Sequence, residues 1–263
     1  MFARPIFLLV SFGLALSTRA AVPPALATAL EHLRAQKSYS WEMINGDPGP
    51  VAQRVETRRG NVTLVQQNIS PHMVGSIDLD GNVLIRRDWT DGIALDTIIT
   101  ATGESVTGTP EGWMTTQEIL SALAEERLQS GTGTRRLTWL RRADRPDLRR
   151  PDQELLPLLK STQVFESTGD SYTTSGRLSS GGGTSGNPAE APPPIDVTVT
   201  LNLRSGVIRD YEVKIDATQS VSRSRVQIPV SEQRIVILTY LPVARISIPD
   251  EAREKLRGLG AKL

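Results

Sequence analysis

The clearest hydrophobic pattern in the chain lies between residues 195 and 203. Apolar and polar side chains alternate there without an exception: Ile195, Val197, Val199, Leu201 and Leu203 alternate with Asp196, Thr198, Thr200 and Asn202. A period of two predicts a strand with one buried face and one solvated face. Similar runs at 211–215, 226–230 and 235–240 extend the prediction to a group of four antiparallel strands.

The amino-terminal half repeats this pattern in shorter runs. Alternation begins at 39–44, and apolar runs follow at 62–65, 83–87 and 93–100. Residues that favour turns separate these runs: Gly60-Asn61, Asp80-Gly81-Asn82, Asp91-Gly92 and Gly103. Because tight turns join antiparallel but not parallel neighbours, the spacing predicts an antiparallel meander.

Four segments have the spacing of helices: residues 24–36, residues 116–129, residues 151–159 and a small helix that begins after Pro249. The second opens with Thr115 three residues before Glu118, which is the spacing of a capping box. Together the elements predict an α+β fold. We expect a large curved antiparallel sheet of about nine to eleven strands, an incomplete barrel, with helices packed on its concave face.

The start of the chain has the pattern of a secretory signal. Residues 1–20 combine an early arginine, an apolar run of about a dozen residues and small residues at Thr18 and Ala20. We therefore expect export by a signal peptide, followed by a single α+β domain over 21–263. Residues 179–194, rich in glycine, serine and proline, predict a flexible loop within that domain.

Composition narrows the range of partners. Removal of residues 1–20 would take away Arg4 and Arg19 and change the formal net charge from +1 to −1, which gives no global field for nucleic acid. The chain has no cysteine. Disulfides, thiolate chemistry and an acylated cysteine after the signal are therefore excluded, and we expect a soluble, non-lipidated periplasmic or secreted protein.

The sequence predicts no catalytic centre, metal site or cofactor. His32 and His72 are the only histidines, and they belong to different elements. No Gly-x-Ser-x-Gly elbow is present, and Asp78-Leu79-Asp80-Gly81-Asn82 fits a hairpin turn better than a calcium loop. One alternative stays open: an unrecognised hydrolase, which requires a cleft that unites either histidine with a serine or a carboxylate.

An arginine-rich stretch over 134–150 is the most distinctive charged feature. Its candidate surface residues for an anionic membrane are Arg135, Arg136, Arg141, Arg142 and Arg145, which accompany Trp139. Such a patch can bind anionic head groups, with the indole at the interface. The alternative is an ordinary solvated face.

The order of the predicted elements resembles that of a known superfamily. The segments that carry the likeness are 30–41, Thr109-Pro110-Glu111-Gly112-Trp113, 197–215 and Ile246-Ser247-Ile248-Pro249. The chain is similar to the periplasmic lipoprotein-carrier superfamily, which includes the periplasmic lipoprotein chaperones and the glycolipid-carrying lipoproteins of mycobacteria. The resemblance implies a curved, incomplete barrel covered by helices, with acyl chains held between the sheet and the helices.

The resemblance therefore implies noncatalytic carriage of a hydrophobic or acylated ligand, a lipid or a lipoprotein. The candidate cavity residues are Trp41, Met43, Trp113, Val199 and Leu201. The alternative is an envelope interaction protein of the same fold with a filled core, which holds its partner through the arginines or a sheet edge. The sequence does not predict an oligomeric state.

Overall fold

The structure is a computed structural model of the whole chain. It describes residues 22–46, 51–57, 60–66, 71–130, 135–144, 149–161, 164–178, 195–221 and 226–261. The predicted signal peptide at 1–20, the predicted loop at 179–194 and Arg145 lie outside the described residues. Side chains are not described at 51–66 or 217–230.

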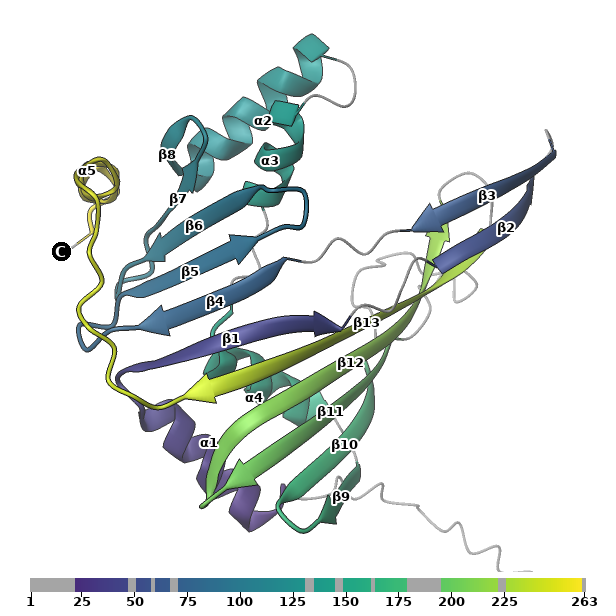
Figure 1. The fold of residues 1–263 in the computed structure, drawn as a ribbon, viewed down its shortest axis with the longest axis vertical. Coiled ribbons are helices and arrows are strands. Elements are labelled where there is room, and N and C mark those ends of the chain that lie inside the picture. Colours follow the sequence, from purple (N-terminus) through teal and green to yellow (C-terminus); the bar gives the residue numbers. More distant parts are fainter. Residues whose placement is uncertain are drawn as a thin grey trace, which may run out of the picture.

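Five helices and thirteen strands lie in the described part of the chain (Figure 1). The helices are α1 (Pro24–Ala35), α2 (Thr116–Ser130), α3 (Arg135–Ala143), α4 (Pro151–Ser161) and α5 (Asp250–Gly258). The strands of the amino-terminal half are β1 (Tyr39–Gly46), β2 (Val51–Thr57), β3 (Gly60–Gln66), β4 (His72–Ile77), β5 (Val83–Asp88), β6 (Ala94–Ile99), β7 (Ser105–Thr109) and β8 (Gly112–Thr115). The remaining strands are β9 (Val164–Thr168), β10 (Ser171–Leu178), β11 (Ile195–Arg204), β12 (Val207–Val221) and β13 (Val226–Thr239).

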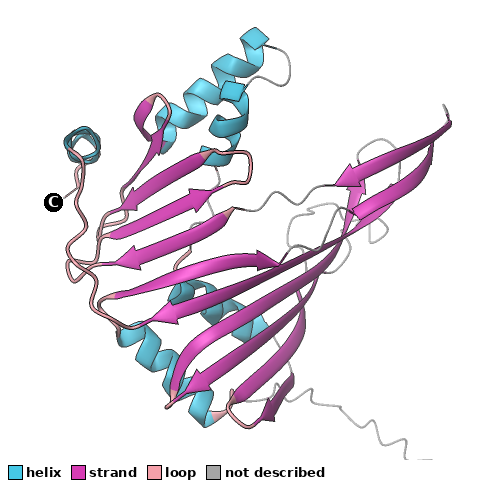
Figure 2. Ribbon diagram, viewed as in Figure 1, coloured by secondary structure: helices cyan, strands magenta, loops and turns pink. Residues whose placement is uncertain are grey.

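Two antiparallel meanders form one sheet of eleven strands within the described residues. Its order is β8-β7-β6-β5-β4-β1-β13-β12-β11-β10-β9, and a separate hairpin of β2 and β3 extends beyond it (Figures 1 and 2). The first strand pairs with the last one, so β1 and β13 join the two meanders at the centre of the sheet. Helices α2, α3 and α4 lie in the connection that takes the chain from one edge strand, β8, to the other, β9.

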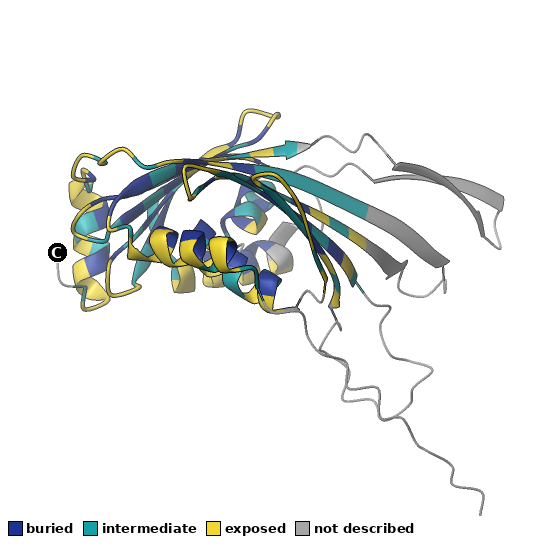
Figure 3. Cartoon of the chain, turned by 90° about the horizontal axis from the view of Figure 1, so that it is seen from below, coloured by how far each residue is buried: buried dark blue, intermediate teal, exposed yellow. Residues whose placement is uncertain are grey.

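The sheet is curved and does not close, because β8 and β9 end the order without pairing (Figure 3). This confirms the predicted α+β class with a large curved antiparallel sheet. Helix α1 buries one apolar side against the sheet, with Leu26, Ala29, Leu30 and Leu33 all in its main hydrophobic cluster. Helix α4 contributes Leu155 and Leu159 to the same cluster. None of the described helices has the length and apolar character needed to cross a bilayer.

The other half of the sheet has helices on both faces. Leu95 packs with Leu123 of α2 and with Leu137 and Leu140 of α3. Alternation along β6 turns Ile98 to the opposite face, where it packs with Ala252 and Leu256 of α5. The terminal helix therefore covers the face that the other helices leave free.

Local structure confirms several sequence predictions. Helix α2 has a reciprocal capping box: the Thr115 amide donates to Glu118 Oε2 at 2.8 Å, and the Glu118 amide donates to Thr115 Oγ1 at 3.2 Å. A turn joins β4 and β5, where the Gly81 amide donates to the Asp78 carbonyl at 3.0 Å and Gly81 has a φ of 83°. The predicted helices at 24–36 and 116–129 agree with α1 and α2 to within one residue at each end.

One sequence prediction was wrong, and one helix was not predicted. The runs at 226–230 and 235–240 belong to one strand, β13, so three strands replace the predicted four. Pro229 does not break β13. Among the described strands, the residues of β13 before Gln233 pair only with β12, and an edge tolerates the missing amide donor. The arginine-rich stretch, for which no helix was predicted, forms α3 over Arg135–Ala143.

Candidate ligand-binding site

The candidate site lies over the centre of the sheet, where one row of side chains crosses five strands. Each residue stands opposite the next on a neighbouring strand: the row is Arg87, Met73, Met43, Val236 and Tyr211. All five line the same cavity. Since neighbouring strands lie about 4.8 Å apart, the row is about 19 Å long. Its centre is apolar, and each end has a polar group.

Helix α4 covers this row, and a partly open cavity of about 480 Å³ lies between the helix and the sheet. Three residues of the helix bring apolar surface to the cavity: Pro151, Pro157 and Leu158. The sheet brings Trp41, Met43 and Met73. Methionine side chains are unbranched and adapt to irregular shapes, so this floor can follow ligands of different outline.

Two buried tyrosines fix the first turn of α4 to the sheet. The Tyr39 hydroxyl donates to Asp152 Oδ1 at 2.7 Å, and the Tyr211 hydroxyl donates to Glu154 Oε2 at 2.7 Å. Burial, and then the adjacent carboxylate, raises the pKa of both hydroxyls far above the ordinary tyrosine value. Both tyrosines therefore stay protonated and keep donating to the helix.

One wall of the cavity is polar. Arg234 donates from Nη2 to Glu154, and its Nη1 lies 3.7 Å from Glu232 Oε1. Asn45 stands opposite Arg234 on β1 and donates from Nδ2 to the carbonyl of Pro71. Two atoms here, Asn45 Oδ1 and Arg234 Nε, are buried and have no hydrogen-bond partner among the described residues.

The other end of the row connects the cavity to α3. Arg87 is fully buried and donates to the Arg142 carbonyl at 2.9 Å and to Thr97 Oγ1 at 3.1 Å. Its guanidinium lies 5.6 Å from the ring centroid of Trp89, and that of Arg142 lies 5.0 Å from the same centroid. Arg87 therefore belongs both to the cavity wall and to the packing of the neighbouring helix.

Trp41 packs closely over its cross-strand partner because that partner is a glycine. Gly75 stands opposite it on β4, and a Cβ built on Gly75 would lie 2.1 Å from the indole ring. No side chain fits beneath the ring. The indole consequently occupies the space that a larger partner would fill and leaves room above it for the cavity.

The predicted cavity residues have three different positions. Trp41 and Met43 line the cavity. Val199 and Leu201 are fully buried in the main cluster with residues of α1 and α4, and they do not line it. Trp113 packs in the cluster of α5 on the opposite face of the sheet, so the structure does not bring it together with the other four.

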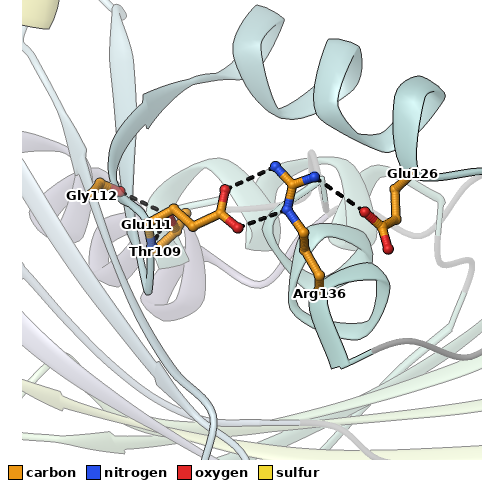
Figure 4. Close-up of polar contacts among 5 residues, drawn as sticks. All are labelled: Thr109, Glu111, Gly112, Glu126 and Arg136. Carbon is orange, nitrogen blue, oxygen red and sulfur yellow. Dashed lines mark hydrogen bonds and ion pairs between the residues drawn. The ribbon is translucent and has the colours of Figure 1, made fainter. Parts of the chain in front are cut away.

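The predicted anionic-surface arginines are also divided. Arg136 forms two bonds with Glu111, at 2.7 and 2.9 Å, and one with Glu126 at 3.1 Å, as Figure 4 shows. Thr109 supports the same turn by donating to the Gly112 carbonyl at 2.8 Å. This network fixes α3 to α2 and to the turn between β7 and β8, and two carboxylates balance the charge of Arg136.

Arg142 is likewise paired, since it donates to Asp91 Oδ1 at 2.7 Å and thereby lowers the pKa of that carboxyl group. Its side chain is only 11% exposed. Arg135 and Arg141 are exposed on the surface of α3. They are the two described arginines of the predicted set whose charges face solvent.

Neither histidine lies at the cavity. His72 contacts Glu42 at 2.8 Å on an exposed part of the sheet, and His32 contacts Gln36 on α1. The described residues contain no group of three or more His, Cys, Asp or Glu side chains with the geometry of a metal site. The cavity therefore offers apolar surface and hydrogen bonds, and its ionisable side chains are arginines, glutamates and a tyrosine.

No family model matches the chain, and no curated protein matches its sequence. The functional case therefore comes from the residues around the cavity.

Most residues that line the cavity were not predicted from the sequence, including Met73, Tyr211, Glu154 and Arg234. Alternation could have assigned Tyr211 to the buried face of its strand, but only the strand order brings these residues around one space.

Proposed function

We propose that this protein binds and carries a hydrophobic or acylated ligand, a lipid or a lipoprotein, without catalysis, after export to the periplasm. The observation that carries the proposal is the cavity of about 480 Å³ between an apolar row of the sheet and α4. Pockets that enclose small ligands commonly have about 300–1,000 Å³. The volume, the apolar floor and the polar margin agree with an elongated amphiphile.

The physical basis of binding is burial of apolar surface. A hydrocarbon tail over Met43, Met73 and Trp41 removes its own surface and theirs from water, at roughly 25 cal/mol for each Å². We infer that α1 and α4 lie in the hollow of the curved sheet, so that the ligand is held between the sheet and these helices.

The alternative was an envelope interaction protein of the same fold with a filled core. A partly open apolar cavity of this size favours carriage over that alternative, because it has room for a small hydrophobic ligand. The exposed arginines of α3 fit a second step of carriage, contact with an anionic membrane, and do not require a different function.

The test compares two tryptophan substitutions at adjacent residues. Met43→Trp fills the floor of the cavity, whereas Ile44→Trp changes the neighbouring residue, which is 40% exposed on the other face of the sheet. The mature protein and both variants are purified from the envelope of the producing cell, and bound compounds are identified by native mass spectrometry and lipid extraction.

We expect an acyl compound with the wild type and with Ile44→Trp, and much less with Met43→Trp. Circular dichroism establishes that both variants are folded. A wild-type protein that carries no acyl compound, and that does not bind an added fluorescent acyl probe, would contradict the proposal.

A further inference from the structure

The polar wall of the cavity specifies the head of its ligand. Asn45 and Arg234 are cross-strand partners on β1 and β13, and both line the cavity. Each has one buried atom without a hydrogen-bond partner in the described part of the chain: the acceptor Asn45 Oδ1 and the donor Arg234 Nε. A buried polar atom without a partner destabilises the protein, so a ligand that bonds to either atom recovers part of this loss.

The orientation of the Asn45 amide follows from its other bond. Its Nδ2 donates to the carbonyl of Pro71. Turning the amide over would direct an oxygen at that carbonyl oxygen, so the free atom is an acceptor. The unmet requirement of this wall is therefore one donor for Asn45 and one acceptor for Arg234.

An anionic head fits this wall poorly. Arg234 already donates to Glu154, and Glu232 lies 3.7 Å from its Nη1. An anion could accept from Arg234 Nε, but it could not donate to Asn45 Oδ1, and it would lie beside two carboxylates. A hydroxyl or an amide meets both requirements, because each of these groups can donate and accept.

On this basis, and resting on the proposed function, we infer that the cavity binds an uncharged amphiphile whose head has a hydroxyl or amide group at the Asn45–Arg234 pair. The hydrocarbon tail lies along the row of Met43, Met73 and Val236. Both atoms belong to side chains that line the cavity. The inferred class is thus a neutral acylglycerol, acyl amide or glycolipid, and not a free fatty acid.

The test uses three probes with the same chain: monolauroylglycerol, methyl laurate and laurate. Each competes with an environment-sensitive fluorescent acyl probe for the mature protein. The first has hydroxyl donors, the second has acceptors only, and the third is anionic. We expect monolauroylglycerol to bind about tenfold more tightly than methyl laurate, which corresponds to one net hydrogen bond, and laurate to bind no better than the ester.

Two leucine variants identify the atom responsible. Asn45→Leu removes Oδ1 and should lower the affinity for monolauroylglycerol to that for methyl laurate, while the affinity for the ester stays the same. The matched control is Asn202→Leu, which removes a strand asparagine that bonds to Asp210 and does not line the cavity. It should change no affinity.

Failure of this inference is distinguishable from failure of carriage. If the three probes bind equally, or laurate binds best, the assignment of the head is overturned while carriage stands. If no probe binds the folded wild type, both are overturned. If Asn45→Leu lowers the affinity for all three probes equally, Asn45 contributes to the shape of the cavity but does not bind the head group. The inference is then also overturned.

Discussion

The sheet has the same cross-strand pair, a tryptophan opposite a glycine, in two regions that differ in burial and in the structure beside the ring. Trp41 faces Gly75 at the centre of the sheet, and Trp113 faces Gly108 near the edge. A Cβ on Gly75 would lie 2.1 Å from its indole, whereas one on Gly108 would lie 3.3 Å away. The first ring is buried beside a cavity, and the second is half-buried under α5.

Apolar side chains attach both α3 and α4 to the sheet, including Leu155 and Leu159 of α4, but beside the cavity the attachment of α4 is polar. Helix α3 packs on the sheet through Leu137, Trp139 and Leu140, which fill the space beneath it. The first turn of α4 meets the sheet through Glu154, whose long side chain reaches Tyr211 and Arg234 tip to tip. Side chains that meet at their tips hold two backbones farther apart than interdigitated leucines do. Polar attachment can therefore keep a cavity open where apolar packing would close it.

The largest expected effect comes from placing a charge in each environment. Val199→Asp puts a carboxylate into fully buried packing, and we expect the free energy of unfolding to fall by more than about 4 kcal/mol. Met43→Asp should cost clearly less, because water can enter the cavity and solvate the new group. Urea denaturation measures both values.

The control for this pair is Thr198→Asp, on the solvated face of the same strand as Val199, which we expect to change stability by about 0.5 kcal/mol or less. Equal losses for Val199→Asp and Met43→Asp would contradict the distinction between filled and hollow regions. A large loss for Thr198→Asp would contradict the assigned face of β11.

The two glycines provide a more direct comparison. Gly75→Ala must displace the buried ring of Trp41, and overpacking of this kind costs about 1–3 kcal/mol. Gly108→Ala should cost about 0.5 kcal/mol or less, because the half-buried ring of Trp113 can yield by a few tenths of an ångström. Thermal denaturation of both variants checks the difference. A larger loss for Gly108→Ala would reverse the comparison.

Features of the fold that depend on residues close together in the sequence could be predicted, and features that depend on distant residues could not. The strand at 195–203 and the capping box of Thr115 and Glu118 follow from neighbours along the chain, and both were predicted. The face of Trp113 was not predicted, since it depends on the register of β8 against β7. Pairing of β1 with β13 brings together residues nearly two hundred positions apart, and no local pattern encodes it.

The same reasoning explains the partial success at the cavity. Alternation around Trp41 and Met43 predicted a buried face, which was sufficient to choose them. Alternation could not separate Trp41 and Met43 from Val199, because residues packed in the core and residues that line the cavity follow the same period of two. The arginines were harder to assign. Composition predicted a charged patch, but Arg136 and Arg142 form ion pairs with Glu111 and Asp91, which lie in other parts of the chain.

The attachment of α4 makes a smaller prediction that depends on pH. Tyr211→Phe removes the hydrogen bond to Glu154, and we expect a loss of about 1.5–2 kcal/mol near neutral pH. Burial, and then Glu154, raises the folded-state pKa of Tyr211 above its unfolded value. The contribution of the hydroxyl is therefore complete below about pH 10 and is lost as the pH rises above it.

Denaturation of wild type and Tyr211→Phe between about pH 8 and pH 11 tests this sign. The stability difference between the two proteins should be constant up to about pH 10 and narrow above it. Tyr39 is present in both proteins and cancels from the comparison. A difference that widens with alkaline pH would contradict the assigned hydrogen bond.

The smallest effect concerns the outer surface of the filled region. Arg135 and Arg141 are exposed on α3, whereas Arg136 is already paired with Glu111 and Glu126. If α3 contacts an anionic membrane, each exposed arginine contributes about 1 kcal/mol, and salt screens the contribution. Arg135→Glu with Arg141→Glu should therefore abolish sedimentation with anionic liposomes at low salt. The matched control, Arg204→Glu with Arg209→Glu, makes the same charge change at exposed positions in the other half of the sheet. Equal losses in both double variants would indicate a general charge effect, and no sedimentation of the wild type at any salt concentration would remove α3 as a membrane contact.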